Sequence, residues 1–289
     1  PLEGLKKRIG NQAEIVYARG YVGDPTSNYN GVVAKVSLEE KRPQAELTAE
    51  ALKIAKDADI VLFIGGLNKS ENQDDEGHDR KHLELPYGQD KLISELAKVN
   101  KNIVFVNISG NAVAMPWTKE VPGIVQGWFL GTEAGNALAN VLVGDVNPSG
   151  KLTSTFPRSV GQLPIYYAHK NTGRPLSNTE GKFEKFRSNY IDERNEPLFP
   201  FGFGLSYTTF EYSNLKISSD KMNFDGKLKV TVDVTNTGNF DGKETVQLYI
   251  RDLVGSVTRP VRELKGFQKI TLKKGEKQTV SFDITVEDL

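Results

Sequence analysis

The hydrophobic pattern changes its period about two-thirds of the way along the chain, and this change constrains the fold more than any other feature. In the first part, unbroken apolar runs at residues 60–64 and 103–106 end at Gly65 and Asn107. Such runs predict strands that are buried on both faces of a parallel sheet. In the last part, residues 228–234 alternate apolar with polar side chains. This alternation predicts antiparallel strands with one face toward water.

Amphipathic patterns lie between the apolar runs. Residues 46–56 predict a helix with Thr48 as its capping residue, and a second helix is expected to begin at Pro86. A third helix is expected from Thr132 to Gly144. Strands and helices that alternate at this spacing predict a mainly parallel sheet flanked by helices. Two further short strands are expected at residues 13–17 and 124–128.

The two patterns predict an α/β domain over residues 1–160 and an antiparallel β-sandwich over residues 211–289. Between them, residues 161–210 are rich in proline and aromatic residues, and we expect this connecting segment to wrap over a domain surface. About five strands are visible in the last part, whereas a sandwich of this kind has about seven. Because the sandwich looks incomplete and the first residue is Pro1, we expect the chain to be a piece of a longer protein.

Composition excludes several classes of function. The 37 basic and 37 acidic side chains give a formal net charge of zero, whereas nucleic-acid binders carry a basic surplus. With no cysteine and only three histidines, the chain is not expected to hold a metal. The glycine-rich loops lack a phosphate-binding pattern, so no cofactor is expected. No apolar run approaches the ~20 residues that span a bilayer, so no membrane segment is expected.

The densest group of ionisable side chains, at residues 71–80, follows the first buried strand. In α/β folds, loops at the carboxyl ends of strands are where ligands bind. The residues alone leave three interpretations open: a solvated surface loop, a calcium site, or a general acid/base. A calcium site is disfavoured because the carboxylates lack the alternation of an EF-hand. An acid/base carboxyl needs a raised pKa, which crowded like charges favour and a nearby arginine opposes.

The two tryptophans, Trp117 and Trp128, are both expected to be core aromatics. Exposed aromatic rings also stack on sugars, so Trp128 is in addition a candidate contact for a carbohydrate ligand. No histidine pairs with a serine in a nucleophile motif, so serine hydrolase chemistry is not expected.

Several segments, taken together, resemble the C-terminal two domains of glycoside hydrolase family 3 β-glucosidases. Their order and spacing hold over nearly the whole chain, and the combination is specific although each segment alone is weak. In chain order the matching segments are residues 76–80 (Glu-Gly-His-Asp-Arg), 85–86 with Gln89, 109–112, 131–136, 144–152, 156–157, 164–167 with 171–175, 199–207 and 234–238.

The resemblance implies a three-domain enzyme: a TIM-like barrel with an aspartate nucleophile, an α/β sandwich that contributes the acid/base, and a fibronectin type III-like module. By this likeness Glu76 is the catalytic acid/base. Asp79 and Arg80 would position its loop and tune its charge, and Glu71 is a neighbouring carboxylate that could support it. Family members are retaining, and retaining enzymes use two carboxyls about 5 Å apart.

The same likeness implies that the parent protein hydrolyses terminal β-D-glucosyl residues, with its nucleophile on a barrel missing from this chain. The fragment alone is therefore expected to be inactive. Expected partners are a β-glucoside or oligosaccharide substrate and the missing barrel, and the resemblance implies a periplasmic or secreted protein. Two alternatives stay open: a non-catalytic carbohydrate- or protein-binding module, and a β-xylosidase or other β-glycosidase of the same family.

Overall fold

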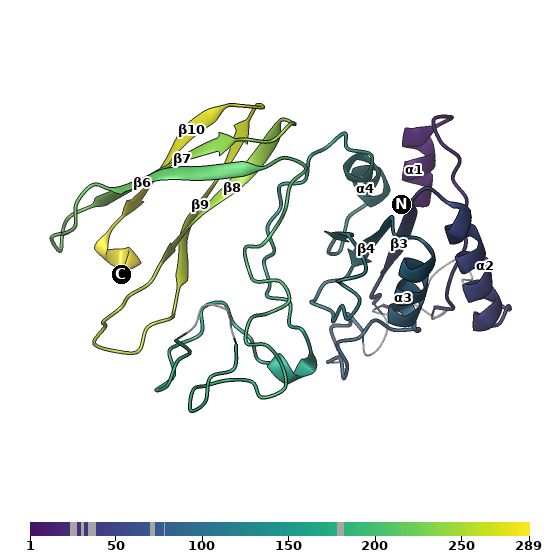
Figure 1. The fold of residues 1–289 in the computed structure, drawn as a ribbon, viewed down its shortest axis with the longest axis horizontal. Coiled ribbons are helices and arrows are strands. Elements are labelled where there is room, and N and C mark those ends of the chain that lie inside the picture. Colours follow the sequence, from purple (N-terminus) through teal and green to yellow (C-terminus); the bar gives the residue numbers. More distant parts are fainter. Residues whose placement is uncertain (24–27, 30–31, 34–38, 70–72, 78, 178–181) are drawn as a thin grey trace. The chain divides into compact units, whose positions relative to one another are not determined.

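The computed structural model describes the chain except for residues 24–27, 30–31, 34–38, 70–72, 78 and 178–181. The described residues form two compact units, Pro1–Leu142 with Phe156–Leu163, and Val143–Thr155 with Pro164–Leu289. Each unit has its own sheets (Figure 1). Each unit also has its own buried hydrophobic side chains. The domain boundaries expected from sequence, at residues 160 and 210, stay a prediction.

The first unit is built on a parallel sheet with the strand order β3-β4-β5. The strands are β3 (Val61–Gly66), β4 (Ile103–Ile108) and β5 (Gly123–Gln126). Their apolar runs supply fully buried side chains such as Phe105 and Val106. Gly66 pairs with Ile108, and Asn107 pairs with Gln126, so the three carboxyl ends meet at one edge of the sheet. The predicted parallel sheet is confirmed.

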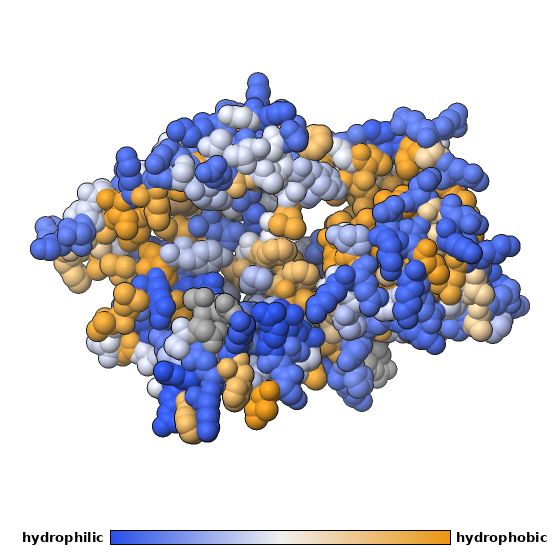
Figure 2. All heavy atoms as spheres, in the orientation of Figure 1, coloured by the Kyte–Doolittle hydropathy of each residue, from blue (hydrophilic) through white to orange (hydrophobic). Residues whose placement is uncertain are grey.

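The described part of the first unit contains four α-helices: α1 (Leu2–Ile9), α2 (Gln44–Asp57), α3 (Gln89–Val99) and α4 (Ala134–Leu142). Helix α2 shows why they form, since it buries Leu47, Ala51 and Ala55 at helical spacing. Figure 2 shows mainly hydrophilic side chains on the outer surface of α2 and α3. A short 3-10 helix, Val160–Gln162, also lies in this unit.

Helices α1 and α4 approach each other through two glycines. A Cβ atom added to Gly4 would lie 2.2 Å from the carbonyl oxygen of Gly135. Any side chain at position 4 would therefore force the two helices apart. Helix α1 therefore packs directly against helix α4.

One prediction about a strand and one about a helix cap were wrong. Residues 13–17 form no strand, and the side chains of Val16 and Tyr17 are both 61% exposed, so they do not contribute to the buried core. The structure instead has two short paired strands that the pattern did not indicate, β1 (Asn28–Tyr29) and β2 (Val32–Val33). Helix α2 begins two residues before Glu46, so Thr48 lies inside the helix and does not cap it.

The start of α3 also differs from the prediction. The helix begins at Gln89 and not at Pro86, because Tyr87 and Gly88 have φ angles of +60° and +71°. These left-handed backbone angles are incompatible with a right-handed helix. The strand expected at residues 124–128 similarly ends at position 126, and Trp128 has a φ of +58°.

Among its described residues, the second unit contains five antiparallel strands in two sheets, with the orders β10-β7-β6 and β8-β9. The strands are β6 (Phe210–Ile217), β7 (Leu228–Asn236), β8 (Gly242–Ile250), β9 (Glu263–Leu272) and β10 (Lys277–Ile284), followed by a 3-10 helix at Val286–Asp288. Both sheets contribute to one core, made by Val234, Val246, Ile270, Leu272 and Val280. The predicted antiparallel sandwich is confirmed.

Candidate active site at the carboxyl edge of the parallel sheet

The loop that follows β3 carries the residue predicted to be the acid/base. Glu76 is exposed on this loop, and so is Asp79. Glu71, the neighbouring carboxylate, lies outside the described residues, as does His78. The loop leaves the sheet at the edge where the ends of β3, β4 and β5 meet, which is the edge that binds ligands in α/β folds.

Gln73 anchors the beginning of this loop. Its side-chain oxygen accepts a hydrogen bond from the backbone N–H of Asn68 at 3.0 Å, and its Nε2 donates to the hydroxyl of Tyr87 at 2.6 Å. Tyr87 is one of the few residues other than glycine with a positive φ. Such backbone strain persists only where surrounding contacts hold it, and it is concentrated near functional sites.

Asp74 joins the loop to the segment that follows β4. Its Oδ2 accepts a hydrogen bond from the backbone N–H of Gly110 at 2.6 Å, and its Oδ1 accepts one from Nδ2 of Asn111 at 2.9 Å. Hydrogen bonds accepted by a carboxylate are stronger than those between neutral groups. Position 110 has little room for a side chain, since a Cβ there would lie 2.9 Å from the ring of Phe129.

Arg80 makes a second connection to the same segment, by donating from Nη2 to the carbonyl oxygen of Ala112. Burial lowers the pKa of the Arg80 guanidinium, and the nearby carboxylate of Asp74 opposes this shift. Its other terminal nitrogen, Nη1, is buried and has no hydrogen-bond partner among the described residues. Arg80 is therefore a half-buried cation at the base of the loop.

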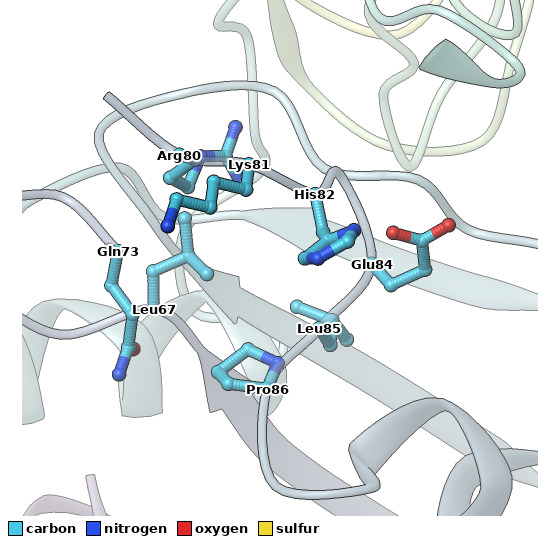
Figure 3. Close-up of a pocket in the computed structure, with 8 residues that line it drawn as sticks. All are labelled: Leu67, Gln73, Arg80, Lys81, His82, Glu84, Leu85 and Pro86. Atoms are coloured by element: carbon cyan, nitrogen blue, oxygen red, sulfur yellow. The ribbon is translucent and has the colours of Figure 1, made fainter.

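A cavity of about 440 Å³ opens beside Arg80. Figure 3 shows Arg80 and Lys81 together at one end, with the carboxylate of Glu84 on the far side of His82. Glu76 is not among the lining residues, which are Leu67, Gln73, Arg80, Lys81, His82, Glu84, Leu85 and Pro86. The cavity thus lies next to the loop but does not contain the candidate carboxylate.

Gln89 lies beneath the site and is fully buried. Its Oε1 accepts from the N–H of Gly66 at 2.9 Å, while its Nε2 donates to the carbonyl of Gly66 at 2.9 Å and to that of Pro86 at 3.1 Å. One side chain therefore ties the last residue of β3, where the loop begins, to the turn that precedes α3.

Asp90, the next residue of α3, holds the segment between the loop and that helix. It accepts hydrogen bonds from the backbone N–H of Leu85 at 2.9 Å and from Nε1 of Trp117 at 2.8 Å. Burial raises the pKa of the Asp90 carboxyl, and these two hydrogen bonds oppose the shift. Trp117 is 1% exposed, as expected of a core aromatic. Trp128 is half-buried, with its ring centroid 6.1 Å from that of Phe156.

The described part of the chain contains no group of three or more histidine, cysteine, aspartate or glutamate side chains that could hold a metal ion. Nor does any helix in that part have the length and apolar character needed to cross a membrane. What the loop offers chemically is an exposed carboxylate with the anchors Asp74 and Arg80 on either side of it in sequence. A carboxylate held in this way can give or take a proton at a bound ligand.

Sequence reasoning missed the residues that hold the loop in place. Gln73 and Asp74 were within the ionisable cluster, and Gln89 was within a matching motif, but no pattern indicated what they contact. Tyr87 gave no signal at all. Their partners lie in other segments of the chain, as far as 37 residues away for Asp74 and Asn111.

Comparison with protein families matches most of the chain. Residues 1–207 match the family described as Glycosyl hydrolase family 3 C-terminal domain, and residues 244–289 match the Fibronectin type III-like domain. The second match coincides with β8, β9 and β10 of the antiparallel sandwich.

Curated relatives are similar over the whole of this chain. It is 45% identical to a protein named periplasmic beta-glucosidase from Salmonella typhimurium and 45% identical to beta-glucosidase BoGH3A from Bacteroides ovatus, and it covers 38% of each. It is 40% identical to a beta-xylosidase from Formosa agariphila, of which it covers 36%. The chain thus spans a little over a third of the length of these relatives.

A solved structure supports the same grouping. The β-glucosidase EmGH1 from Erythrobacter marinus superimposes with a TM-score of 0.82 at 34% sequence identity. The match covers 99% of this chain and 38% of the other.

Proposed function

Because the chain belongs to glycoside hydrolase family 3, we propose that it is part of a retaining β-glucosidase that removes terminal β-D-glucosyl residues. The observation that carries this proposal is the exposed carboxylate of Glu76, on a loop anchored at Asp74 and Arg80, at the ligand-binding edge of the sheet. The activity belongs to the whole protein, of which these 289 residues supply one part.

Glu76 acts as the acid/base in this proposal. In the first step it gives its proton to the glycosidic oxygen while the bond from that oxygen to the anomeric carbon breaks, and a nucleophilic carboxylate bonds to that carbon. In the second step Glu76 takes a proton from water as the water displaces the carboxylate. Asp79 and Arg80 position the loop, and Glu71 remains a candidate supporting carboxylate.

The nucleophile is assigned to a barrel domain outside these residues. It would have to lie about 5 Å from Glu76 to fit a retaining mechanism. An acid must hold its proton at the working pH, which burial favours. Glu76 is exposed here, so the surface that would enclose it must also come from elsewhere in the whole protein. We therefore expect the 289-residue chain alone to have negligible hydrolytic activity.

The substrate is assigned as a β-glucoside or a β-linked oligosaccharide, with Trp128 as a candidate contact. This assignment is supported by the names of the two relatives at 45% identity. A β-xylosidase is the second candidate, because a relative at 40% identity carries that name. Location in the periplasm or outside the cell is part of the proposal and is supported by the name of the Salmonella protein. The three-part division at residues 160 and 210 is kept as part of it.

The proposal is tested by replacing Glu76 with alanine in the full-length protein. Proton donation matters most when the leaving group is a weak acid, so kcat/KM for phenyl β-glucoside should fall by about 10²–10⁴-fold. The loss should be much smaller for dinitrophenyl β-glucoside, whose leaving group departs without a proton. The matched control is Asp59→Ala, which removes an exposed carboxylate just before β3, at the opposite end of the strand from the loop.

A loss of less than about tenfold on the phenyl substrate would contradict the assignment of Glu76. Turnover of the same substrate by the 289-residue chain alone would contradict the assignment of the nucleophile to another part of the protein. Comparison of phenyl β-glucoside with phenyl β-xyloside, measured on the unaltered full-length protein, decides between the two candidate substrates.

A further inference from the structure

We infer that Asp74 is a positioning residue for the acid/base: it fastens the Glu76 loop to the loop after β4 and so fixes where the catalytic carboxyl lies. This inference rests on the proposed role of Glu76 and extends it to a residue that does not touch the substrate. The juxtaposition that carries it is the pair of hydrogen bonds from Asp74 to Gly110 and Asn111.

The hydrogen bonds of Asp74 reach a distant segment of the chain, unlike the hydrogen bond that Asp75 accepts within the loop. Both of its carboxylate oxygens accept hydrogen bonds from a segment 36 and 37 residues further along the chain. Asp75 instead accepts a local hydrogen bond from the N–H of Gly77 at 3.0 Å, which shapes the turn containing Glu76. Asp74 therefore fixes the position of the turn, whereas Asp75 fixes its shape.

The partner segment is itself well supported. Ser109 is fully buried, and its hydroxyl donates to the carbonyl of Asn111 at 2.8 Å. Asn107, also fully buried, donates from Nδ2 to the hydroxyl of Ser109 at 2.8 Å and to the side chain of Gln126 at 2.6 Å. Asp74 thus binds to a segment that is tied to the ends of both β4 and β5.

The loop has a second fastening on the other side of Glu76. Arg80 donates to Ala112, so the chain between positions 74 and 80 is attached at both ends to residues 110–112. Loss of the Asp74 side chain would leave Arg80 as the remaining one of these two links between the Glu76 loop and residues 110–112. A displacement of about 1 Å in a catalytic group can lower the rate by about 10²-fold.

The effect should therefore resemble a weaker form of the loss of Glu76. In the full-length protein, Asp74→Ala should lower kcat/KM for phenyl β-glucoside by about 10–100-fold. For dinitrophenyl β-glucoside, which needs no proton, the loss should stay below about threefold. A residue that only stabilised the fold would lower the activity on both substrates by the same factor, since it would change only the amount of active enzyme.

Asn111→Ala supplies a second, milder variant that removes one of the two hydrogen bonds. It should lower kcat/KM for the phenyl substrate by about 3–10-fold, again with little effect on the dinitrophenyl substrate. Because that bond is already lost in Asp74→Ala, the double variant should be no slower than Asp74→Ala alone. The matched control is again Asp59→Ala, and thermal unfolding of each variant checks that the protein is folded.

The outcomes separate this inference from the proposed function. If Glu76→Ala shows the leaving-group dependence and Asp74→Ala does not, the positioning role is wrong and the assignment of Glu76 stands. If Glu76→Ala lacks that dependence, the assignment of the acid/base fails and the positioning role fails with it. If Asp74→Ala does not fold, Asn111→Ala becomes the test, and equal losses of kcat/KM on both substrates would overturn the inference. The double-mutant cycle is then made with the milder Asp74→Asn, and additive losses of kcat/KM in that cycle would also overturn the inference.

Discussion

Replacing Gln89 by leucine should destabilise the first unit by about 3 kcal/mol. Leucine is similar in size to glutamine but has no polar atoms in its side chain. The two groups of Gly66 that Gln89 satisfies, an N–H and a carbonyl, would lose their partner in a buried position. Each buried polar group left unsatisfied costs about 1–3 kcal/mol, which gives about 2–6 kcal/mol for the pair.

Two further effects determine the net change in the free energy of unfolding. Burying the apolar side chain of leucine offsets about 1–2 kcal/mol of that loss. The third partner of Gln89, the carbonyl of Pro86, is only partly buried, so water can replace the glutamine there at little cost. The expected decrease in the free energy of unfolding is therefore about 3 kcal/mol.

Urea unfolding followed by tryptophan fluorescence measures this decrease. The chain has two tryptophans, Trp117 and Trp128, and both belong to the first unit, so their fluorescence reports on that unit alone. With a slope of about 2 kcal/mol per molar urea, the midpoint should fall by about 1.5 M. The control is Lys91→Ala, an exposed position on α3 whose effect should stay within about 0.5 kcal/mol. A fall of less than about 0.5 M for Gln89→Leu would refute the reasoning.

Two further predictions concern the stability of the first unit. Burial, and then the neighbouring Tyr87 and Tyr17, raise the pKa of Tyr21 from its ordinary value of 10.0 to about 12. The stability that this raised pKa contributes is full below pH 10 and is lost as the pH rises from 10 to about 12. The free energy of unfolding of Tyr21→Phe should therefore decline less steeply over that window than that of the unaltered protein. An unchanged decline would contradict this. Gly4→Ala should cost about 1–3 kcal/mol because a Cβ collides with α4, whereas Gly131→Ala meets open space and should be neutral. Equal melting temperatures for these two variants would count against the close helix contact.

The architecture was predictable from the sequence because the way an element is buried sets the spacing of its apolar residues along the chain. The apolar runs at residues 60–64 and 103–106 need burial on both faces, which a parallel sheet between layers of helices provides. Both runs form strands of the parallel sheet. Residues 13–17 failed as a strand for the opposite reason: the side chains of Val16 and Tyr17 are exposed and do not contribute to the buried core.

The position of the candidate site in the fold was predictable from the sequence, but the contacts that hold its loop were not. The position of the charged loop after β3 follows from the rule that ligands bind at the carboxyl edge of a sheet. The fastening of Asp74 to Gly110 depends on the register between β3 and β4, which the order of residues along the chain does not express. The late start of α3 depends on the left-handed backbone of Tyr87, for which tyrosine gives no local signal.

The contact between α1 and α4 bears on how the protein is made. Helix α1 has only eight residues, and a helix that short has little stability in isolation. Its partner begins at Ala134, so the ribosome must add about 125 more residues before the two glycines can meet. At typical synthesis rates of about 5–20 residues per second, this takes on the order of ten seconds. During that interval the nascent α1 is a segment that chaperones and proteases can reach.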